Sequence, residues 1–207
     1  MNIAVFASGR GSNFQAILNA IQQGHLPAKI SAVISNNSAS GALEIARACA
    51  IPAFHISQRQ FATEDSFNEE VAKTLRSHHT DFIALAGYMK KLSPSLIGQY
   101  RHRIANVHPA LLPAFGGPGM YGVHVHEAVL ACGAKVTGAT VHLVDEEYDH
   151  GAIVMQKAVE VLHDDTPESL AVRVLLVEHD LYPKALKAFA EGRVRIEGRN
   201  VWIQPSR

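Results

Sequence analysis

The sequence predicts an α/β fold with a mostly parallel, twisted sheet, helices on both of its faces, and antiparallel strands in the C-terminal half. Two observations predict it. Over the first half of the chain, apolar runs of strand length alternate with helical periodicity, the pattern of βα units on a parallel sheet. The second half carries long β-branched segments at 136–144 and 152–161, joined by a loop, which is typical of antiparallel pairing.

The strands of the first half are short aliphatic runs, as expected for strands buried on both faces. They are predicted at 3–7, 30–34, 53–56, 82–86 and 104–107. After the first run, apolar residues recur at helical spacing, and Ser12 or Asn13 is expected to cap the helix that they indicate.

Proline and small polar residues indicate where the other helices begin and end. A helix at 41–50 ends before Pro52, because a residue that precedes proline disfavours the helical region. The chain ends with a predicted hairpin at 194–203. The remaining helix starts are Thr63 or Asp65, Ser93-Pro94, and Thr166-Pro167, the last of which begins a helix to about residue 190.

Composition limits the class of protein. The chain has 207 residues, 47% of them hydrophobic, and lacks a composition break, so we expect a single domain over 1–207. Nineteen basic and nineteen acidic residues give a formal net charge of zero, which disfavours nucleic acid or a membrane surface as a partner. Two widely separated cysteines and the absence of a signal-like start favour a cytoplasmic location.

A glycine-rich loop follows the first predicted strand and opens a helix. Such a position offers free backbone N–H groups and the positive end of the helix dipole to an anion. The dinucleotide fingerprint fails because Phe14 stands where its third glycine belongs, and a Gly-Lys-Ser/Thr ending is missing. Gly11, Ser12 and Asn13 are therefore candidates to hold a single phosphate; the alternative is a tight turn with a helix cap.

The segment around Asn106 and His108 is the second candidate. Residues two apart on an extended chain point to the same side, so an amide and an imidazole meet at the end of a strand. Both can donate to the oxyanion of a tetrahedral intermediate in acyl transfer, and histidine can also carry a proton. The alternative is a strand end at which His108 only satisfies backbone groups.

An acidic loop at 145–151 separates the two long strands of the second half. A carboxylate from this loop beside His108 would favour the imidazolium and raise the pKa of that histidine. The alternative is a solvated turn.

Twelve histidines also permit a metal site. A metal-dependent hydrolase would use His108, His124, His126 and Asp149 around an activated water. The sequence lacks the HExxH and HxxxH patterns of such enzymes, and we expect no metal. His142 and His150 receive no role.

Three motifs together resemble the glycinamide ribonucleotide formyltransferases of purine biosynthesis, over nearly the whole chain. Residues 4–13 are similar to that family's substrate-phosphate loop, Asn106-x-His108-Pro109 to its catalytic segment, and 138–151 to its folate-loop signature. The resemblance implies a Rossmann-like formyltransferase fold and transfer of the formyl group of 10-formyltetrahydrofolate to glycinamide ribonucleotide. The second motif and the Asp149-x-Gly151 pair also occur in the wider superfamily, including formyltetrahydrofolate deformylase.

The resemblance also implies roles for individual residues. Asn106, His108 and Asp149 are the matching catalytic groups, with Asn106 also near the folate, and Asp145 becomes a loop neighbour. Glu178 contacts the glycinamide end of the ribonucleotide. The pterin is bordered by Met89, Lys90, Lys91 and Leu92.

The implied organisation is a phosphate-binding half at about 1–100 and a folate-binding half at about 101–207. The partners are the two small-molecule substrates, and the chain is expected to be a monomer or homodimer. The glycine-rich stretch at 116–121 and the residues Glu64 and Leu175 depart from some family members, so no contacts are transferred to them. A module that binds a nucleotide or folate without catalysis is the remaining alternative.

Overall fold

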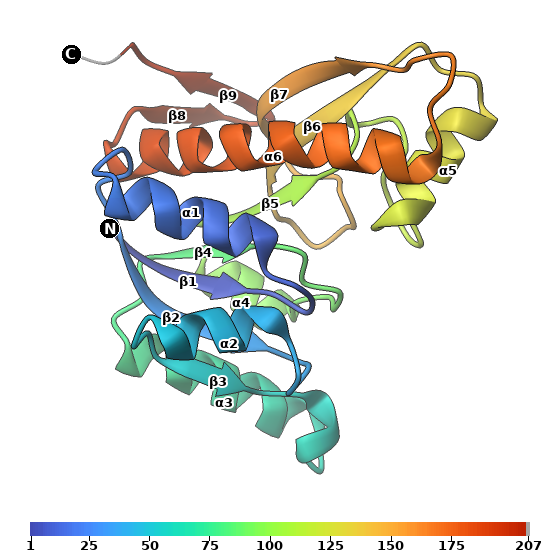
Figure 1. The fold of residues 1–207 in the computed structure, drawn as a ribbon. Coiled ribbons are helices and arrows are strands. Elements are labelled where there is room, and N and C mark those ends of the chain that lie inside the picture. Colours follow the sequence, from blue (N-terminus) through green and yellow to red (C-terminus); the bar gives the residue numbers. More distant parts are fainter. Residues whose placement is uncertain (206–207) are drawn as a thin grey trace. The chain divides into compact units, whose positions relative to one another are not determined.

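The computed structural model describes residues 1–205. The chain forms two compact units, Met1–Ala105 and a second that begins at Asn106. Figure 1 labels the elements of both units.

The N-terminal unit contains a parallel sheet in the order β3-β2-β1-β4. Its strands are β1 (Asn2–Phe6), β2 (Lys29–Ser35), β3 (Ala53–His55) and β4 (Phe82–Leu85). Residues 3–7 are fully buried, as their apolar run predicts. The carboxyl ends of these parallel strands lie at one edge of the sheet, where a ligand site is expected.

Helices cover both faces of this sheet. They are α1 (Ser12–Gln22), α2 (Gly41–Ala48), α3 (Glu64–Ser77) and α4 (Pro94–Gln99), with a 3₁₀ turn at Gln58–Gln60. Right-handed crossovers from β1 to β2 to β3 place α1 and α2 on one face, and the return to β4 places α3 on the other. Figure 1 shows α1 and α2 nearer the viewer than α4.

The second unit is built on antiparallel pairing. Its elements are β5 (Ile104–His108), which begins at the unit boundary, α5 (Val123–Ala131), β6 (Val136–Leu143), β7 (Ile153–Glu160), α6 (Pro167–Ala190), β8 (Val194–Glu197) and β9 (Asn200–Ile203). Strands β6 and β7 pair antiparallel, as do β8 and β9. The long helix α6 packs on β6 and β7, and β9 lies against β7.

The predicted fold class is confirmed, and so are three of the helix starts. The side chains of Thr63, Ser93 and Thr166 each accept a hydrogen bond from the backbone of the third residue after them, as N-caps do. Helix α6 continues through Pro183 to Ala190.

Two local features differ from expectation. Neither Ser12 nor Asn13 caps α1, because Gly11 is the N-cap and no side chain caps that helix. Helix α5 was not predicted at all. Its alternating sequence Val-His-Val-His has the period of a strand, and its N-cap, Gly122, gives no side-chain signal.

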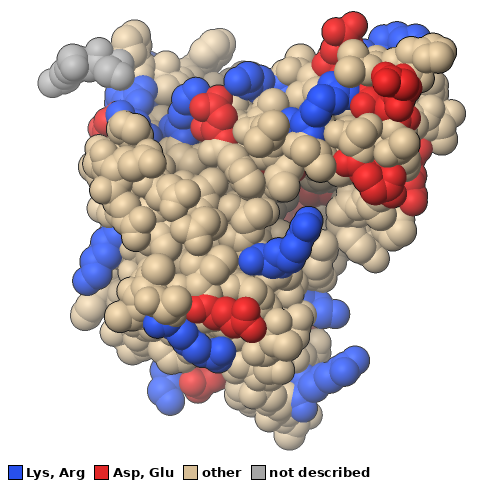
Figure 2. Space-filling model, viewed as in Figure 1, with Lys and Arg blue, Asp and Glu red and all other residues tan. Residues whose placement is uncertain are grey.

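Charge is mixed on both units. On the face shown in Figure 2, each unit carries both basic and acidic side chains. This distribution agrees with an anion bound by local donors better than with one bound by a broad positive field. None of the helices within residues 1–205 combines the length and apolar character needed to cross a membrane.

Candidate active site

The glycine-rich loop of the N-terminal unit is shaped by close packing at Gly11. This residue has φ +84°, and a Cβ atom there would lie 2.8 Å from the Cα of Ala42. Both facts require glycine. The first turn of α1 contains no acidic residue and no side-chain cap. The positive end of the helix dipole at Ser12 and Asn13 is therefore not offset locally, which favours an anion.

Ser8 connects this loop to two neighbouring loops of the same unit. Its hydroxyl donates to the Asn36 amide oxygen at 2.5 Å and accepts from the Met89 N–H at 2.8 Å. Its own N–H donates to the Gly87 carbonyl at 3.0 Å. No local motif at Ser8 predicts these contacts, although all three segments follow neighbouring parallel strands.

The segment that the resemblance assigns to the pterin begins at this connection. Met89 is 49% exposed, Lys90 and Lys91 are exposed, and Leu92 is buried. The Ser8 hydroxyl thus fixes the backbone at the start of a largely exposed segment.

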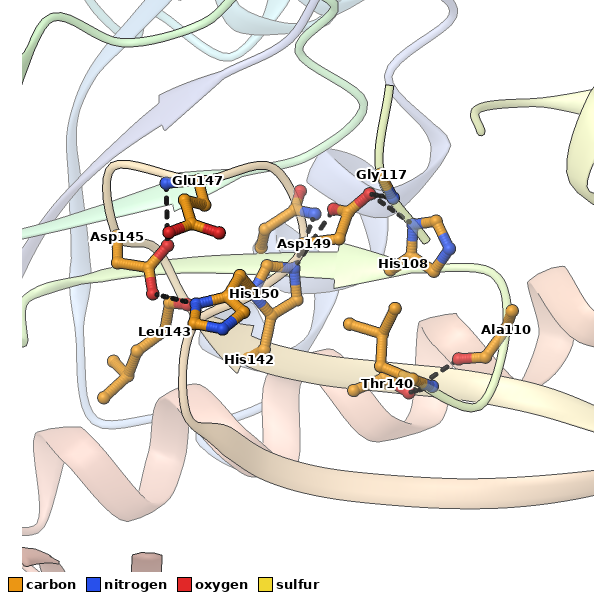
Figure 3. Close-up of polar contacts among 12 residues, drawn as sticks. His108, Ala110, Gly117, Thr140, His142, Leu143, Asp145, Glu147, Asp149 and His150 are labelled. Atoms are coloured by element: carbon orange, nitrogen blue, oxygen red, sulfur yellow. Dashed lines mark hydrogen bonds and ion pairs between the residues drawn. The ribbon is translucent and has the colours of Figure 1, made fainter. Parts of the chain in front are cut away.

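His108 and Asp149 meet in the second unit, as the sequence predicts. The Nδ1 atom of His108 lies 3.6 Å from Oδ2 of Asp149, and the two side chains are only 4% and 13% exposed. His108 Nε2 lies 2.8 Å from the Phe115 carbonyl, to which it donates. The Gly117 N–H donates to the same Asp149 oxygen at 2.9 Å (Figure 3).

His142 joins these residues to Asn106, which sequence reasoning did not foresee. Its Nδ1 donates to the Leu143 carbonyl at 2.8 Å, and its Nε2 lies 3.1 Å from the Asn106 amide nitrogen. The same Nε2 lies 3.5 Å from Oδ1 of Asp149. Asn106, His142, Asp149 and His108 therefore form one continuous set of contacts. The signal for His142 was its place near the end of strand β6, three residues before Asp145 of the acidic loop.

The pKa of His108 differs from the expected direction. Burial lowers the pKa of His108, and this outweighs the raising effects of Asp149 and of the Phe115 carbonyl. The expectation of a raised pKa for His108 is therefore wrong, because it rests on the Asp149 carboxylate alone and leaves out the burial of the imidazole. Burial raises the pKa of Asp149, but the hydrogen bond with His142, the charge of His108 and the Gly117 N–H together lower it below its usual value.

The backbone around His108 is constrained. Phe115 and Asp149, which both contact its ring, have φ of +55° and +54°. These left-handed conformations are unfavourable for residues other than glycine and persist where the surroundings impose them. At Gly151 a Cβ atom would lie 1.8 Å from the Leu143 carbonyl oxygen, so only glycine fits there.

Thr140 of β6 anchors the segment after His108. Its hydroxyl donates to the Ala110 carbonyl at 2.6 Å and accepts from the Leu112 N–H at 3.0 Å (Figure 3). Gln156 of β7 donates to the same hydroxyl and to the Leu112 carbonyl. This buried network fixes the exit of β5 relative to β6.

The other candidate residues lie apart from this set or in different surroundings. Asp145 pairs with His150 at 3.1 Å and not with His108. His124 is exposed and pairs with Glu127, whereas His126 is buried and its pKa is lowered by burial and by the charge of His108. Across residues 1–205 the four proposed ligands are not gathered into a group that could hold a metal ion.

Glu178 lies on α6 and is 7% exposed. Its neighbour His179 is partly buried, and burial lowers the pKa of that histidine. The contact of Glu178 with a substrate, which the resemblance implies, stays a prediction.

Comparisons with known proteins identify the family of this chain. The family model described as "Formyl transferase" matches residues 1–186. The chain is 33% identical to phosphoribosylglycinamide formyltransferase of Escherichia coli, over all of this chain and 95% of that protein. It superposes on glycinamide ribonucleotide transformylase 1 of Symbiobacterium toebii with a TM-score of 0.93 at 39% identity, covering 99% of this chain and 94% of that one. The chain therefore belongs to the formyl transferase family, and the resemblance inferred from its motifs is confirmed.

A plant relative shows that related chains differ in length. The chain is 43% identical to the chloroplastic phosphoribosylglycinamide formyltransferase of Arabidopsis thaliana, over 93% of this chain. It spans 66% of the length of that protein.

Proposed function

We propose that this chain transfers the formyl group of 10-formyltetrahydrofolate to the amine of glycinamide ribonucleotide, as a step of purine biosynthesis. The observation that carries the proposal is the match to 95% of the Escherichia coli phosphoribosylglycinamide formyltransferase, which bears this acceptor in its name. The contacts among Asn106, His142, Asp149 and His108 supply suitable chemistry.

The reaction requires one bond to form and one to break. The neutral amine attacks the formyl carbon, the tetrahedral intermediate carries an oxyanion, and the bond from that carbon to N10 of the folate then breaks. One proton leaves the attacking amine and one reaches N10. Asn106 and His108 stabilise the oxyanion, as preorganised donors and charges do in acyl transfer.

The pKa of His108 refines the role of this residue. Because burial lowers that pKa, His108 is largely neutral at rest near pH 7 and can accept the proton that the amine loses. Asp149, whose pKa is held below its usual value, stays ionised and stabilises the imidazolium that forms. A proton that reaches His108 as the oxyanion forms is then available for N10.

The binding roles follow the same proposal. The backbone at Gly11, Ser12 and Asn13 holds the phosphate, and Glu178 contacts the glycinamide end. The folate is bordered by Met89, Lys90, Lys91 and Leu92, with Asn106 beside its formyl group. Residues 1–100 and 101–207 act as phosphate-binding and folate-binding halves of one domain.

The test is to follow the folate absorbance when the protein meets 10-formyltetrahydrofolate with and without glycinamide ribonucleotide. Loss of the formyl group only in the presence of the acceptor is the expected result. Equal loss without the acceptor would indicate a deformylase, in which water attacks. Binding without release of tetrahydrofolate would indicate a module that does not catalyse.

Location and assembly complete the proposal. Cys49 and Cys132 are free and exposed, which supports the cytoplasm as the location. The chain is proposed to act as a monomer or homodimer, with small-molecule substrates and without nucleic acid or membrane as partners. Cell fractionation and sedimentation test these points, and a larger assembly would contradict the second.

A further inference from the structure

The hairpin β8–β9 reaches the loop that carries Asp149. Arg199 lies in the turn between the two strands, and its Nη2 donates to the backbone carbonyl of His150 at 2.6 Å. Its Nη1 lies 3.2 Å from each ring nitrogen of the same histidine. A hydrogen bond from a charged donor is among the stronger kinds, so Arg199 is a substantial anchor for the main chain next to Asp149.

The acidic loop has a local framework of its own around Asp145. One oxygen of this carboxylate accepts from the Glu147 N–H at 3.0 Å, and the other lies 3.1 Å from His150 Nδ1 (Figure 3). The residues at 146–148 between these contacts are exposed. An exposed loop with few buried contacts opens easily, so an anchor from outside the loop matters for its geometry.

Close contacts on several sides restrict the position of the Asp149 carboxylate. Its backbone is held at φ +54°, and its Oδ2 lies 2.9 Å from the Gly117 nitrogen and 3.6 Å from His108 Nδ1. Arg199 donates a hydrogen bond to the carbonyl of His150, the residue after Asp149. The next residue, Gly151, packs closely against the Leu143 carbonyl. A displacement of about 1 Å at a catalytic group costs as much as 10²-fold in rate.

We infer that Arg199 is a positioning residue, whose guanidinium holds the His150 main chain and thereby keeps the Asp149 carboxylate beside His108. The inference rests on the proposed function of Asp149. The family model ends at residue 186, so this contact comes from a segment that the shared family pattern does not cover. The hairpin thus gains a role in the formation of the site.

The experiment compares Arg199→Ala with Arg195→Ala in the full chain. Arg195 lies in the same hairpin but is 67% exposed and pairs only with Glu197 among the ion pairs within residues 1–205. In Arg199→Ala we expect kcat to fall about tenfold while KM for both substrates stays within about twofold. We also expect faster hydrogen exchange of the amides at 145–151. Arg195→Ala should match the wild type in all these measurements.

The outcomes separate the two proposals. Unchanged kcat and unchanged exchange in Arg199→Ala would overturn the inference. The inference would also be overturned if Arg199→Ala lost thermal stability and if kcat and substrate affinity fell equally as a result. That outcome is expected of a residue that only stabilises the fold. If the wild type transfers no formyl group, the proposed function fails, and hydrogen exchange alone decides whether Arg199 holds the loop.

Discussion

The Gly11 loop and the His108 site present different chemical groups: backbone N–H groups at the first, and buried ionisable side chains at the second. At Gly11 the chain offers backbone N–H groups at a helix start, and the key requirement is the absence of a side chain. At His108 the chain buries ionisable side chains in contact with one another, and both His108 and Asp149 have pKa values shifted by their environment. The first arrangement is suited to binding a ligand group of constant charge. The second is suited to stabilising a charge that forms during a reaction. Variants in the two regions should therefore affect different kinetic constants.

The largest effect is expected at the His108 site. His108→Ala and Asp149→Asn should each lower kcat by about 10²–10³-fold, because in the proposed mechanism each residue stabilises charge in the transition state. KM should change much less, and circular dichroism should show an intact fold. His124→Ala is the control, since that exposed histidine pairs with Glu127 on the surface. Rates near the wild-type value in His108→Ala would refute the mechanism.

A smaller and different effect is expected at the Gly11 loop. Gly11→Ala places a Cβ atom 2.8 Å from the Ala42 backbone at a φ of +84°, so the loop must shift. We expect KM for glycinamide ribonucleotide to rise about tenfold, equivalent to roughly 1.4 kcal/mol of binding, with kcat nearly unchanged. Gly98→Ala, where a Cβ atom meets nothing within 4 Å, is the matched control. A fall in kcat with unchanged KM in Gly11→Ala would contradict the expected difference between the two regions.

Ser8 offers a sharper test, because it connects two segments that are proposed to bind the two substrates. Ser8→Ala removes the acceptor for the Met89 N–H and the donor to Asn36, each worth about 1 kcal/mol. We expect KM for both substrates to rise about two- to fivefold. Ser77→Ala, which loses a bond to the Thr74 carbonyl and a contact with His78 Nδ1 in the same unit, should leave both KM values unchanged. An effect on one substrate alone would show that Ser8 does not connect the two segments.

The two regions were also predicted from sequence to different degrees. The Gly11 loop, His108 and Asp149 lie in recognisable motifs. Short aliphatic runs located β1 to β5, and long β-branched segments located β6 and β7. His142 and Arg199 could not be found in this way. Each acts through a contact with a residue far away in sequence or through a main-chain carbonyl, and such contacts leave no local pattern. The lowered pKa of His108 likewise depends on burial by segments that become its neighbours only on folding.

The smallest expected effect is a dependence of stability on pH. Burial lowers the pKa values of His108, His126 and His179 below 6.5, so the unfolded chain binds protons more readily than the folded one. The free energy of unfolding should therefore fall as the pH is lowered below about 6.5. The depressed pKa of Asp149 adds a further loss, but only below its usual value of 3.8.

Thermal unfolding at pH 7.5, 6.5 and 5.5 measures this dependence, since 1 kcal/mol shifts Tm by roughly 2–4 °C in a chain of this size. His126→Gln replaces a buried histidine outside the contacts of Asp149 and should reduce the slope between pH 6.5 and 5.5. His163→Gln, at an exposed position, should leave the slope unchanged. If both variants keep the wild-type slope, burial of His126 does not contribute, and the acid sensitivity of the fold resides in His108, His179 or other groups.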